Sequence, residues 1–151
     1  MTAATSPDLP APLAALVAEF TALDRAERFE LLIEFADRFR PAPAEITGYP
    51  YAEEHRVTHC ESDAYVWAEG CPGSALKFHF IVENPQGLSA RAWAAILDET
   101  LSGQPIEQIA AVPPDIVFAF FGREVAMGRG QGLMGMLALV QRLARNHRKG
   151  A

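Results

Sequence analysis

Residues 57–67 read Val57-Thr58-His59-Cys60-Glu61-Ser62-Asp63-Ala64-Tyr65-Val66-Trp67. They place one of the two cysteines of the chain, Cys60, directly before a segment whose side chains alternate as they do along a β-strand. The alternation runs from Ala64 to Glu69, and the strong turn signal Gly70-Cys71-Pro72-Gly73 follows it. Residues 76–81 then alternate again, with one Leu and two Phe side chains on the same face. The pattern predicts an antiparallel hairpin with one face against helices, entered through a loop that carries Cys60.

Helical patterns precede the hairpin. Apolar residues recur at helical spacing over residues 13–20. Asp24 followed by Glu27 resembles a capping box, with Asp in the usual Ser or Thr place, and predicts a second helix that ends near Phe39 before Pro41. The apolar stripe of this second helix, expected to face the core, contains Phe29, Leu32, Ile33, Ala36 and Phe39.

Further helical segments are predicted after the hairpin. Ser89 can cap a helix that ends before Gly103. Pro105 is placed as the first-turn proline of a short helix through Ala110. Residues 115–121 are so apolar that they predict a short helix buried on most sides.

Together these elements predict an α+β fold. Its small antiparallel sheet of about three strands, the third weakly indicated around residues 56–58, would be packed by helices from both ends of the chain. A length of 151 residues with 50% hydrophobic composition suits one domain with one core. We expect a disordered leader over residues 1–10, a single domain over residues 11–147 and a tail over residues 148–151.

Charge and apolar patterning argue against two classes of protein. The net charge of −6 disfavours nucleic-acid binding, which requires a basic face. No run approaches the roughly 18 apolar residues of a membrane span, and the first residues lack the pattern of a signal peptide. These observations predict a cytoplasmic protein that binds neither nucleic acid nor membrane and whose cysteines are free thiols.

Cys60 is the candidate reactive residue. A thiol is a nucleophile only as thiolate, a form that a positive or polar neighbourhood favours. His55, Arg56 and His59 are close in sequence, but several acidic residues oppose them, so local charge alone does not predict a strongly ionised cysteine. The alternative that Cys60 packs as a small hydrophobe remains open at this point.

Three stretches resemble segments of the SufE family, the sulfur-accepting partners of cysteine desulfurases in iron-sulfur cluster assembly. Residues 59–67 are similar to its Gly-Cys-x-Ser-x-Val-Trp segment. Residues 24–34 resemble its acidic-Arg-aromatic-x-x-Leu-Ile-Glu helix, and residues 128–137 resemble its Ser-Arg-x-Asn-Gly-x-x-x-Met segment. The three stretches occur in the order that the family has.

The chain departs from the family's pattern at several positions. His59 stands where Gly is usual, and Gly128 and Gln131 replace Ser and Asn. Three residues, where the family often has one, separate Ser62 from the Val-Trp pair, and residues 84–88 replace a Ser-Asp-Ala segment. The resemblance therefore indicates a divergent member.

The resemblance implies a SufE/NifU-like fold and a persulfide relay. Cys60 as thiolate would take the terminal sulfur from the persulfide of a SufS-like cysteine desulfurase and pass it to an Fe-S scaffold complex. The chain would then be a sulfurtransferase-type carrier and desulfurase activator rather than a stand-alone enzyme. Pyridoxal phosphate (PLP) would belong to the desulfurase, and no cofactor or metal is expected on this chain. The sequence leaves a homodimer open.

Arg129 and His59 are the further candidate site residues. The last helix is expected to start near Arg129 or Gln131, where the three glycines between residues 128 and 132 would let the backbone turn sharply. The match to the family's Arg implies that the Arg129 guanidinium holds a carboxylate or a partner loop near the thiol, and the alternative is a solvated arginine at a helix start. His59 would be a general acid or charge neighbour of the thiol, or only an exposed loop residue.

Other functions also use a cysteine in such a loop. A nucleophilic peptidase would need a histidine, a role that His79 could approach, together with an oxyanion hole, but no family signature supports it. A metal site would combine Cys60 and Cys71 with His55, His59 and His79, although the two cysteines are 11 positions apart and form no Cys-x-x-Cys pair. A non-catalytic interaction protein, in which Cys60 only packs, is the third alternative.

Cys71 is expected to be dispensable. At about 3.3 Å per residue, an extended strand over residues 64–69 separates Cys60 from Cys71 by about 20 Å or more. A disulfide tolerates a Cα separation of only about 7 Å, so we expect no bond between these two cysteines.

Overall fold

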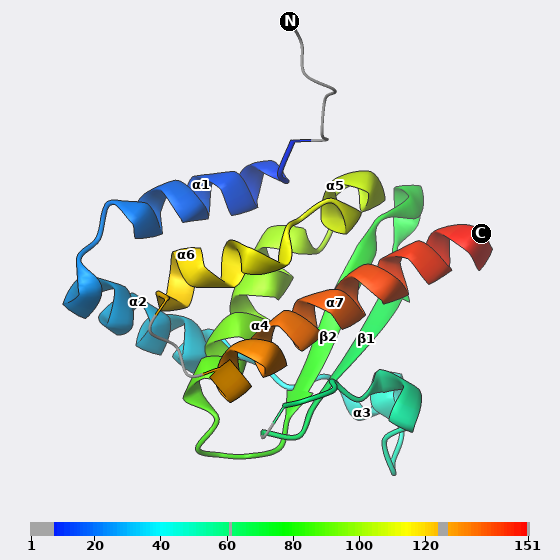
Figure 1. Ribbon diagram of the computed structural model, residues 1–151. Coiled ribbons are helices and arrows are strands. Elements are labelled where there is room, and N and C mark those ends of the chain that lie inside the picture. The colour runs from blue at the N-terminus through cyan, green and yellow to red at the C-terminus, as the bar shows by residue number, and fades with distance from the viewer. Residues whose placement is uncertain (1–7, 61, 124–126, 151) are drawn as a thin grey trace, which may run out of the picture.

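The computed structural model describes residues 8–60, 62–123 and 127–150 (Figure 1). Its elements in chain order are α1 (Ala11–Thr21), α2 (Arg25–Arg38), α3 (Ala44–Thr47), β1 (Ala64–Gly70), β2 (Leu76–Val82), α4 (Leu88–Leu101), α5 (Ile106–Ala110), α6 (Val117–Phe121) and α7 (Met127–Gly150). Short 3₁₀ turns lie at Glu53–His55, Pro72–Ser74 and Pro114–Ile116. Residues 1–7 of the expected leader and residue 151 of the expected tail lie outside the described residues.

β1 and β2 form the predicted antiparallel hairpin, in which Ala64 pairs with Val82. The sheet has two strands in the described residues, so the expectation of about three strands was wrong. The third segment forms only a single bridge, between Arg56 and Tyr65. His59, with a φ of 62°, then turns the chain out of strand geometry before a ladder can form.

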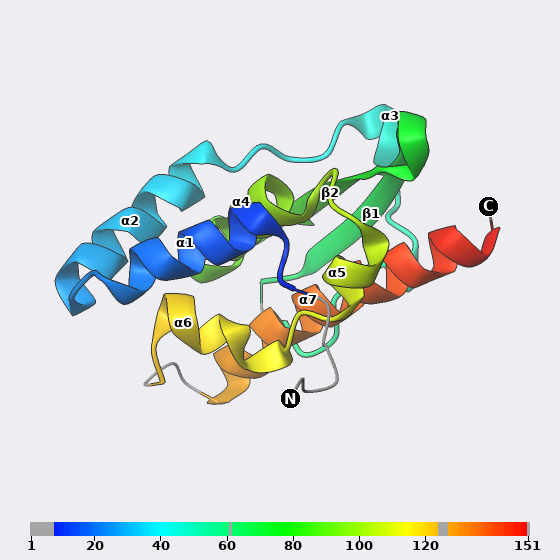
Figure 2. The same cartoon turned by 90° about the horizontal axis from the view of Figure 1, so that it is seen from above.

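α4 is the central helix of the core. Every residue from Ala92 to Leu97 is buried, and the helix packs against α1, α2, β2 and α7. Figures 1 and 2 show α1 and α2 on one side of α4 and the hairpin on the other. The α+β class is therefore confirmed. None of the helices in the described ranges has the length and apolar character needed to cross a membrane.

Local backbone chemistry sets the starts of α2 and α4. The Asp24 carboxylate accepts a hydrogen bond from Glu27 N–H at 2.8 Å, and the Glu27 carboxylate accepts one from Asp24 N–H at 2.9 Å, which is the predicted capping box. α4 is preceded by Gly87 rather than by the predicted cap Ser89. The reason is a turn, closed by a hydrogen bond from Gly87 N–H to the Asn84 carbonyl, that leads directly into the helix.

α7 begins at Met127, earlier than the predicted start near Arg129 or Gln131. The three glycines between residues 128 and 132 are therefore helical and form no sharp turn. Burial of an apolar face favours the helix here, since the buried residues include Leu133, Met136, Leu137 and Val140. Residues 148–150, expected in the tail, continue the helix.

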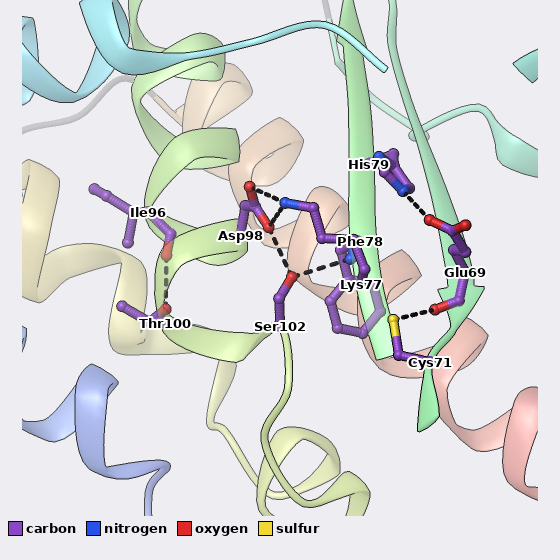
Figure 3. Close-up of polar contacts among 9 residues, drawn as sticks. All are labelled: Glu69, Cys71, Lys77, Phe78, His79, Ile96, Asp98, Thr100 and Ser102. Carbon is purple, nitrogen blue, oxygen red and sulfur yellow. Dashed lines mark hydrogen bonds and ion pairs between the residues drawn. The ribbon is translucent and has the colours of Figure 1, made fainter. Parts of the chain in front are cut away.

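The C-terminal end of α4 is tied to the middle of β2. Phe78 N–H donates a hydrogen bond to Ser102 Oγ at 3.0 Å, and the Ser102 hydroxyl donates to Asp98 at 2.7 Å. Figure 3 shows that Asp98 also binds the Lys77 ammonium, with an Nζ to Oδ1 distance of 2.6 Å. A single acidic side chain thus joins the helix to the strand.

Other backbone groups on the two edges of the hairpin are also occupied. The contacts are Ala42 N–H to the Phe80 carbonyl (2.9 Å), Gly103 N–H to the Leu76 carbonyl (2.8 Å), Val57 N–H to the Ala64 carbonyl (2.8 Å) and His55 Nδ1–H to the Val66 carbonyl (2.8 Å). Loops and helix ends therefore take the places that neighbouring strands would have in a wider sheet.

The face of β1 that points away from the helices is covered by residues 49–55. Tyr65 and Trp67 are buried on this face. The Tyr51 ring lies 4.9 Å from the Tyr65 ring, and the His55 ring stacks on Trp67 at 5.0 Å between centroids. Burial raises the pKa of the Tyr65 hydroxyl. These aromatic residues serve the packing of the hairpin.

Candidate functional site

Residues 57–63, hereafter the thiol loop, lead into β1 and carry Cys60. Asp63 N–H donates a hydrogen bond to the Cys60 carbonyl at 3.4 Å and closes a tight turn. His59 and Asp63 have φ values of 62° and 51°, a left-handed conformation that residues other than glycine rarely adopt. Cys60 therefore lies in a sharp turn, and the residue is partly exposed to solvent. Glu61 lies outside the described residues.

The thiol loop is held between the starts of α4 and α7. On the α4 side, Asn84 N–H donates a hydrogen bond to the Ser62 carbonyl at 3.1 Å. On the α7 side, the backbone next to Cys60 lies against Gly132. The position of the thiol therefore follows from the packing of two helices that are far from it in sequence.

Cys60 borders a pocket of about 360 Å³, hereafter the thiol pocket, between the thiol loop, α2 and the starts of α4 and α7. Its polar lining consists of His59, Ser62, Asn84, Gln86, Ser89 and Arg129. Phe29, Leu88 and Leu133 are the larger apolar residues of the lining. A separate pocket of about 620 Å³ reaches Cys60 from the side of Glu53 and Arg56. Cys60 thus borders a pocket on each of two sides.

The structure brings the three predicted site residues, Cys60, His59 and Arg129, to the thiol pocket. Arg129 lies in the first turn of α7, and its side chain is exposed. Within the described part of the chain, its guanidinium has no ion-pair partner. Arg129 also lines a neighbouring pocket of about 570 Å³ together with Arg25 and Arg28. Three cationic side chains therefore lie along a surface that begins at the thiol.

Phe29 was expected on the buried stripe of α2, but it is 56% exposed. The buried residues of α2 are Leu32, Phe35 and Ala36. The helical period places Phe29 toward the start of α4, but the space there is open: Phe29 lines both the thiol pocket and the neighbouring 570 Å³ pocket. Periodicity alone cannot distinguish a pocket from a packed core.

Asn84 and Ser89 are pocket residues that the sequence did not indicate as such. Both lie near the start of α4, in or next to the stretch where the chain departs from the Ser-Asp-Ala segment of the family it resembles. Ser62 also lines the pocket, and its place two residues after Cys60 was the available signal.

The alternative metal site is not assembled in the part of the chain that the structure describes. No group of three or more His, Cys, Asp or Glu side chains there could hold a metal ion. His79 lies opposite Trp67 in the hairpin, and its Nε2 is 2.8 Å from a Glu69 carboxylate oxygen (Figure 3). His79 lines neither of the two pockets that border Cys60, so the structure does not bring it to the thiol as a Cys-His peptidase dyad would require.

Both cysteines are free thiols, and β1 runs between them. Cys71 is exposed in the turn that follows β1, with its Sγ 3.8 Å from the Glu69 carbonyl (Figure 3). The two thiols therefore lie at opposite ends of one strand.

The left-handed conformation of His59 gives a first prediction. His59→Val is expected to lower the free energy of unfolding by about 1–2 kcal/mol, because a β-branched residue is strained at positive φ. His59→Gly is expected to leave that free energy equal or slightly higher, since glycine adopts this conformation freely. Urea denaturation measures both variants. Equal losses of unfolding free energy in the two variants would show that the histidine ring, rather than the backbone conformation, contributes the stability.

Comparisons with known proteins agree with this geometry. A family model described as the SufE Fe-S metabolism associated domain matches residues 14–144. Two proteins of Mycobacterium tuberculosis, from strains CDC 1551 / Oshkosh and ATCC 25618 / H37Rv and both named uncharacterized SufE-like proteins, are each 29% identical over 147 residues, 96% of this chain and 98% of theirs. The solution structure of a hypothetical protein from Thermus thermophilus has a TM-score of 0.76 at 26% identity and covers 94% of this chain and 99% of that one. Because the family model extends from α1 into α7, the chain belongs to the SufE family, whose domain is associated with Fe-S metabolism.

Proposed function

We propose that this protein accepts persulfide sulfur from a SufS-like cysteine desulfurase onto Cys60 and delivers it to an Fe-S scaffold complex. Membership of a family associated with Fe-S metabolism supports the setting. The observation that carries the proposal is the placing of Cys60: a partly exposed cysteine in a sharp turn, packed on one side against the core, that borders a pocket shared with Arg129. Free thiols suit the reducing cytoplasm, which is the compartment we propose.

The proposed reaction is a thiol-persulfide exchange. Cys60 as thiolate attacks the terminal sulfur of the partner's Cys–S–SH group, the S–S bond of that group breaks, and the partner's cysteine leaves as a thiolate. A new S–S bond forms on Cys60, so the number of sulfur-sulfur bonds is unchanged and no external oxidant or reductant is needed. A nucleophile of the recipient repeats the exchange when the sulfur is delivered. PLP remains on the desulfurase, which produces the persulfide.

Arg129 is proposed to bind an anionic group of the partner beside the thiol. Its guanidinium is exposed, and its two-pronged donor geometry matches a carboxylate. The thiol pocket also holds uncharged hydrogen-bonding side chains from Ser62, Asn84 and Ser89, which suit an extended backbone or a polar loop. The partner's persulfide-bearing segment would therefore be oriented by charge on one side and by neutral polar groups on the other.

The direct experiment is mass spectrometry of the protein after incubation with an active desulfurase and cysteine. An increment of about 32 Da, one sulfur atom, is expected on the peptide that contains Cys60. The same protein incubated without cysteine is the control. If the desulfurase is from the same organism and active, and no increment appears, the chain is instead a non-catalytic interaction protein.

Substitution of Arg129 gives a second prediction. Arg129→Ala is expected to weaken stimulation of the desulfurase by at least about tenfold, because a charge-assisted hydrogen bond contributes about 1.5–3 kcal/mol. Arg129→Lys is expected to restore it only in part, since a point charge cannot replace the paired donors. Alanine production by the desulfurase at varied concentrations of each variant is the measurement.

Arg142→Ala is the matched control for this series, because Arg142 is an exposed arginine of the same helix that does not line the thiol pocket. It should behave as the wild type does. Equal stimulation by all three Arg129 forms would reduce Arg129 to a solvated residue at a helix start.

A further inference from the structure

The geometry points to Gly132 as a positioning residue for Cys60: its missing side chain lets the backbone of the thiol loop lie directly on α7. The inference rests on the proposed function only for its consequence in sulfur transfer. The contact itself is a property of the fold.

The first observation is how little space separates helix and loop. A Cβ atom at Gly132 would lie 2.9 Å from the His59 carbonyl oxygen and 3.1 Å from the Cys60 Cα. Both atoms belong to the backbone, so no side-chain rotation can relieve the clash. Any residue other than glycine at this position must move either the helix or the loop.

The second observation is that the same face of α7 contacts the loop again at the next turn. A Cβ at Gly135 would lie 2.8 Å from the Thr58 carbonyl oxygen and 3.4 Å from Val57 Cγ1. Residues 132 and 135 are three apart and therefore lie on one side of the helix. The two glycines leave a helix surface without side chains, and the backbone of residues 57–60 packs directly against it. Gly132 is the glycine next to Cys60.

The thiol loop is also closely packed where it meets the start of α4. A Cβ at Gly87 would lie 2.6 Å from Ser62 Oγ and 3.1 Å from the Asn84 carbonyl oxygen. The hydrogen bond from Asn84 N–H to the Ser62 carbonyl holds this side in place. These contacts hold the Ser62 end of the loop, so a residue at position 132 that pushes on His59 and Cys60 moves the thiol rather than the whole loop.

At position 132 the helix favours alanine, whereas the contact with the thiol loop requires glycine. This difference allows an experiment to separate a positioning role from a structural one. Glycine is less favourable than alanine inside a helix, so Gly132→Ala improves the local helix preference. The same methyl group pushes the backbone of the thiol loop at His59 and Cys60 away from α7. A positioning role thus predicts loss of sulfur transfer without a matching loss of stability.

The test compares Gly132→Ala with wild type in three measurements. The thermal midpoint is expected to stay within a few degrees. Maximal stimulation of the desulfurase is expected to fall about 10–100-fold, the effect that a misplacement of about 1 Å has on a reacting group, with a smaller change in the half-saturating concentration. The rate of Cys60 alkylation by iodoacetamide is expected to rise severalfold, and amide NMR shifts are expected to change mainly in residues 57–63.

Gly70→Ala is the matched control. A Cβ there would also meet an atom at 2.9 Å, but that atom belongs to the exposed ring of His147, which can move, at the hairpin end remote from the thiol. This variant should keep wild-type sulfur transfer and alkylation. Gly135→Ala, whose clash is with Thr58, should show the same changes as Gly132→Ala to a smaller extent, and it decides the question if Gly132→Ala does not fold.

Two results would overturn the inference: wild-type transfer and alkylation in the folded variant, or a loss of transfer that only parallels a loss of stability. The alkylation and NMR measurements need no desulfurase. If wild-type protein accepts no sulfur, the proposed function fails. The alkylation and NMR measurements still decide whether Gly132 sets the position of the thiol loop.

Discussion

Cys60→Ser should abolish persulfide acceptance and leave the thermal midpoint within a few degrees of the wild-type value. A serine hydroxyl is not ionised near neutral pH and cannot attack a persulfide sulfur as a thiolate does. The fold should tolerate the change, because Cys60 is only partly buried and oxygen is smaller than sulfur. Mass spectrometry after incubation with desulfurase and cysteine, with a thermal melt of the same sample, gives both readings.

Cys71→Ser is the control for this experiment. Cys71 is exposed in the turn after β1, and nothing in that turn requires a thiol. The variant should accept sulfur on Cys60 at the wild-type level. Stimulation that survives Cys60→Ser, or an increment found mainly on Cys71, would show that the relay mechanism is wrong.

Trp93→Ala should lower the free energy of unfolding by about 3–5 kcal/mol, the usual range for removal of a buried aromatic residue. Trp93 is 0% exposed, and its ring lies 5.4 Å from that of Phe120. Its indole Nε1–H donates a hydrogen bond to the Leu133 carbonyl at 2.9 Å. The residue therefore joins α4 to α7, the two helices that hold the thiol loop, and urea denaturation measures the loss.

Two further variants calibrate this effect. Trp93→Phe keeps most of the volume but removes the indole N–H, so it should cause a smaller loss than Trp93→Ala. Phe29→Ala removes an aromatic ring that is 56% exposed and should cost less than about 1 kcal/mol. A similar loss in Trp93→Ala and Phe29→Ala would mean that α4 is not the centre of the core.

The sequence predicted those parts of the fold that depend on neighbours along the chain. The hairpin over residues 64–82, the capping box at Asp24 and the short helix that includes residues 117–121 all have strong local signals, and the structure confirms them. The prediction of a third strand was wrong because the pairing depends on the direction of the chain after Thr58. His59 has a left-handed conformation there and turns the chain toward α7.

The sequence predicted which residues belong to the candidate site better than it predicted their arrangement in space. Cys60 and Arg129 were indicated by resemblance, and His59 by its place next to the thiol in sequence. Their meeting at one pocket depends on the docking of α7 against the hairpin, which no local pattern encodes. The glycines near Arg129 were interpreted as a turn because glycine disfavours helix. In the structure they are helical, and the close approach of a second backbone at Gly132 accounts for a glycine there.

The occupied edges of the hairpin limit how this protein can associate with copies of itself. Along β2, backbone groups at alternate residues, Leu76, Phe78 and Phe80, are bonded within the molecule. Over residues 76–80, all of which the structure describes, each of these three residues has one backbone group bonded within the molecule, so a strand from a second chain could not form a complete ladder along this edge. If the protein dimerises, we expect the copies to meet through side-chain surfaces, and this edge should resist strand-by-strand stacking into fibrils.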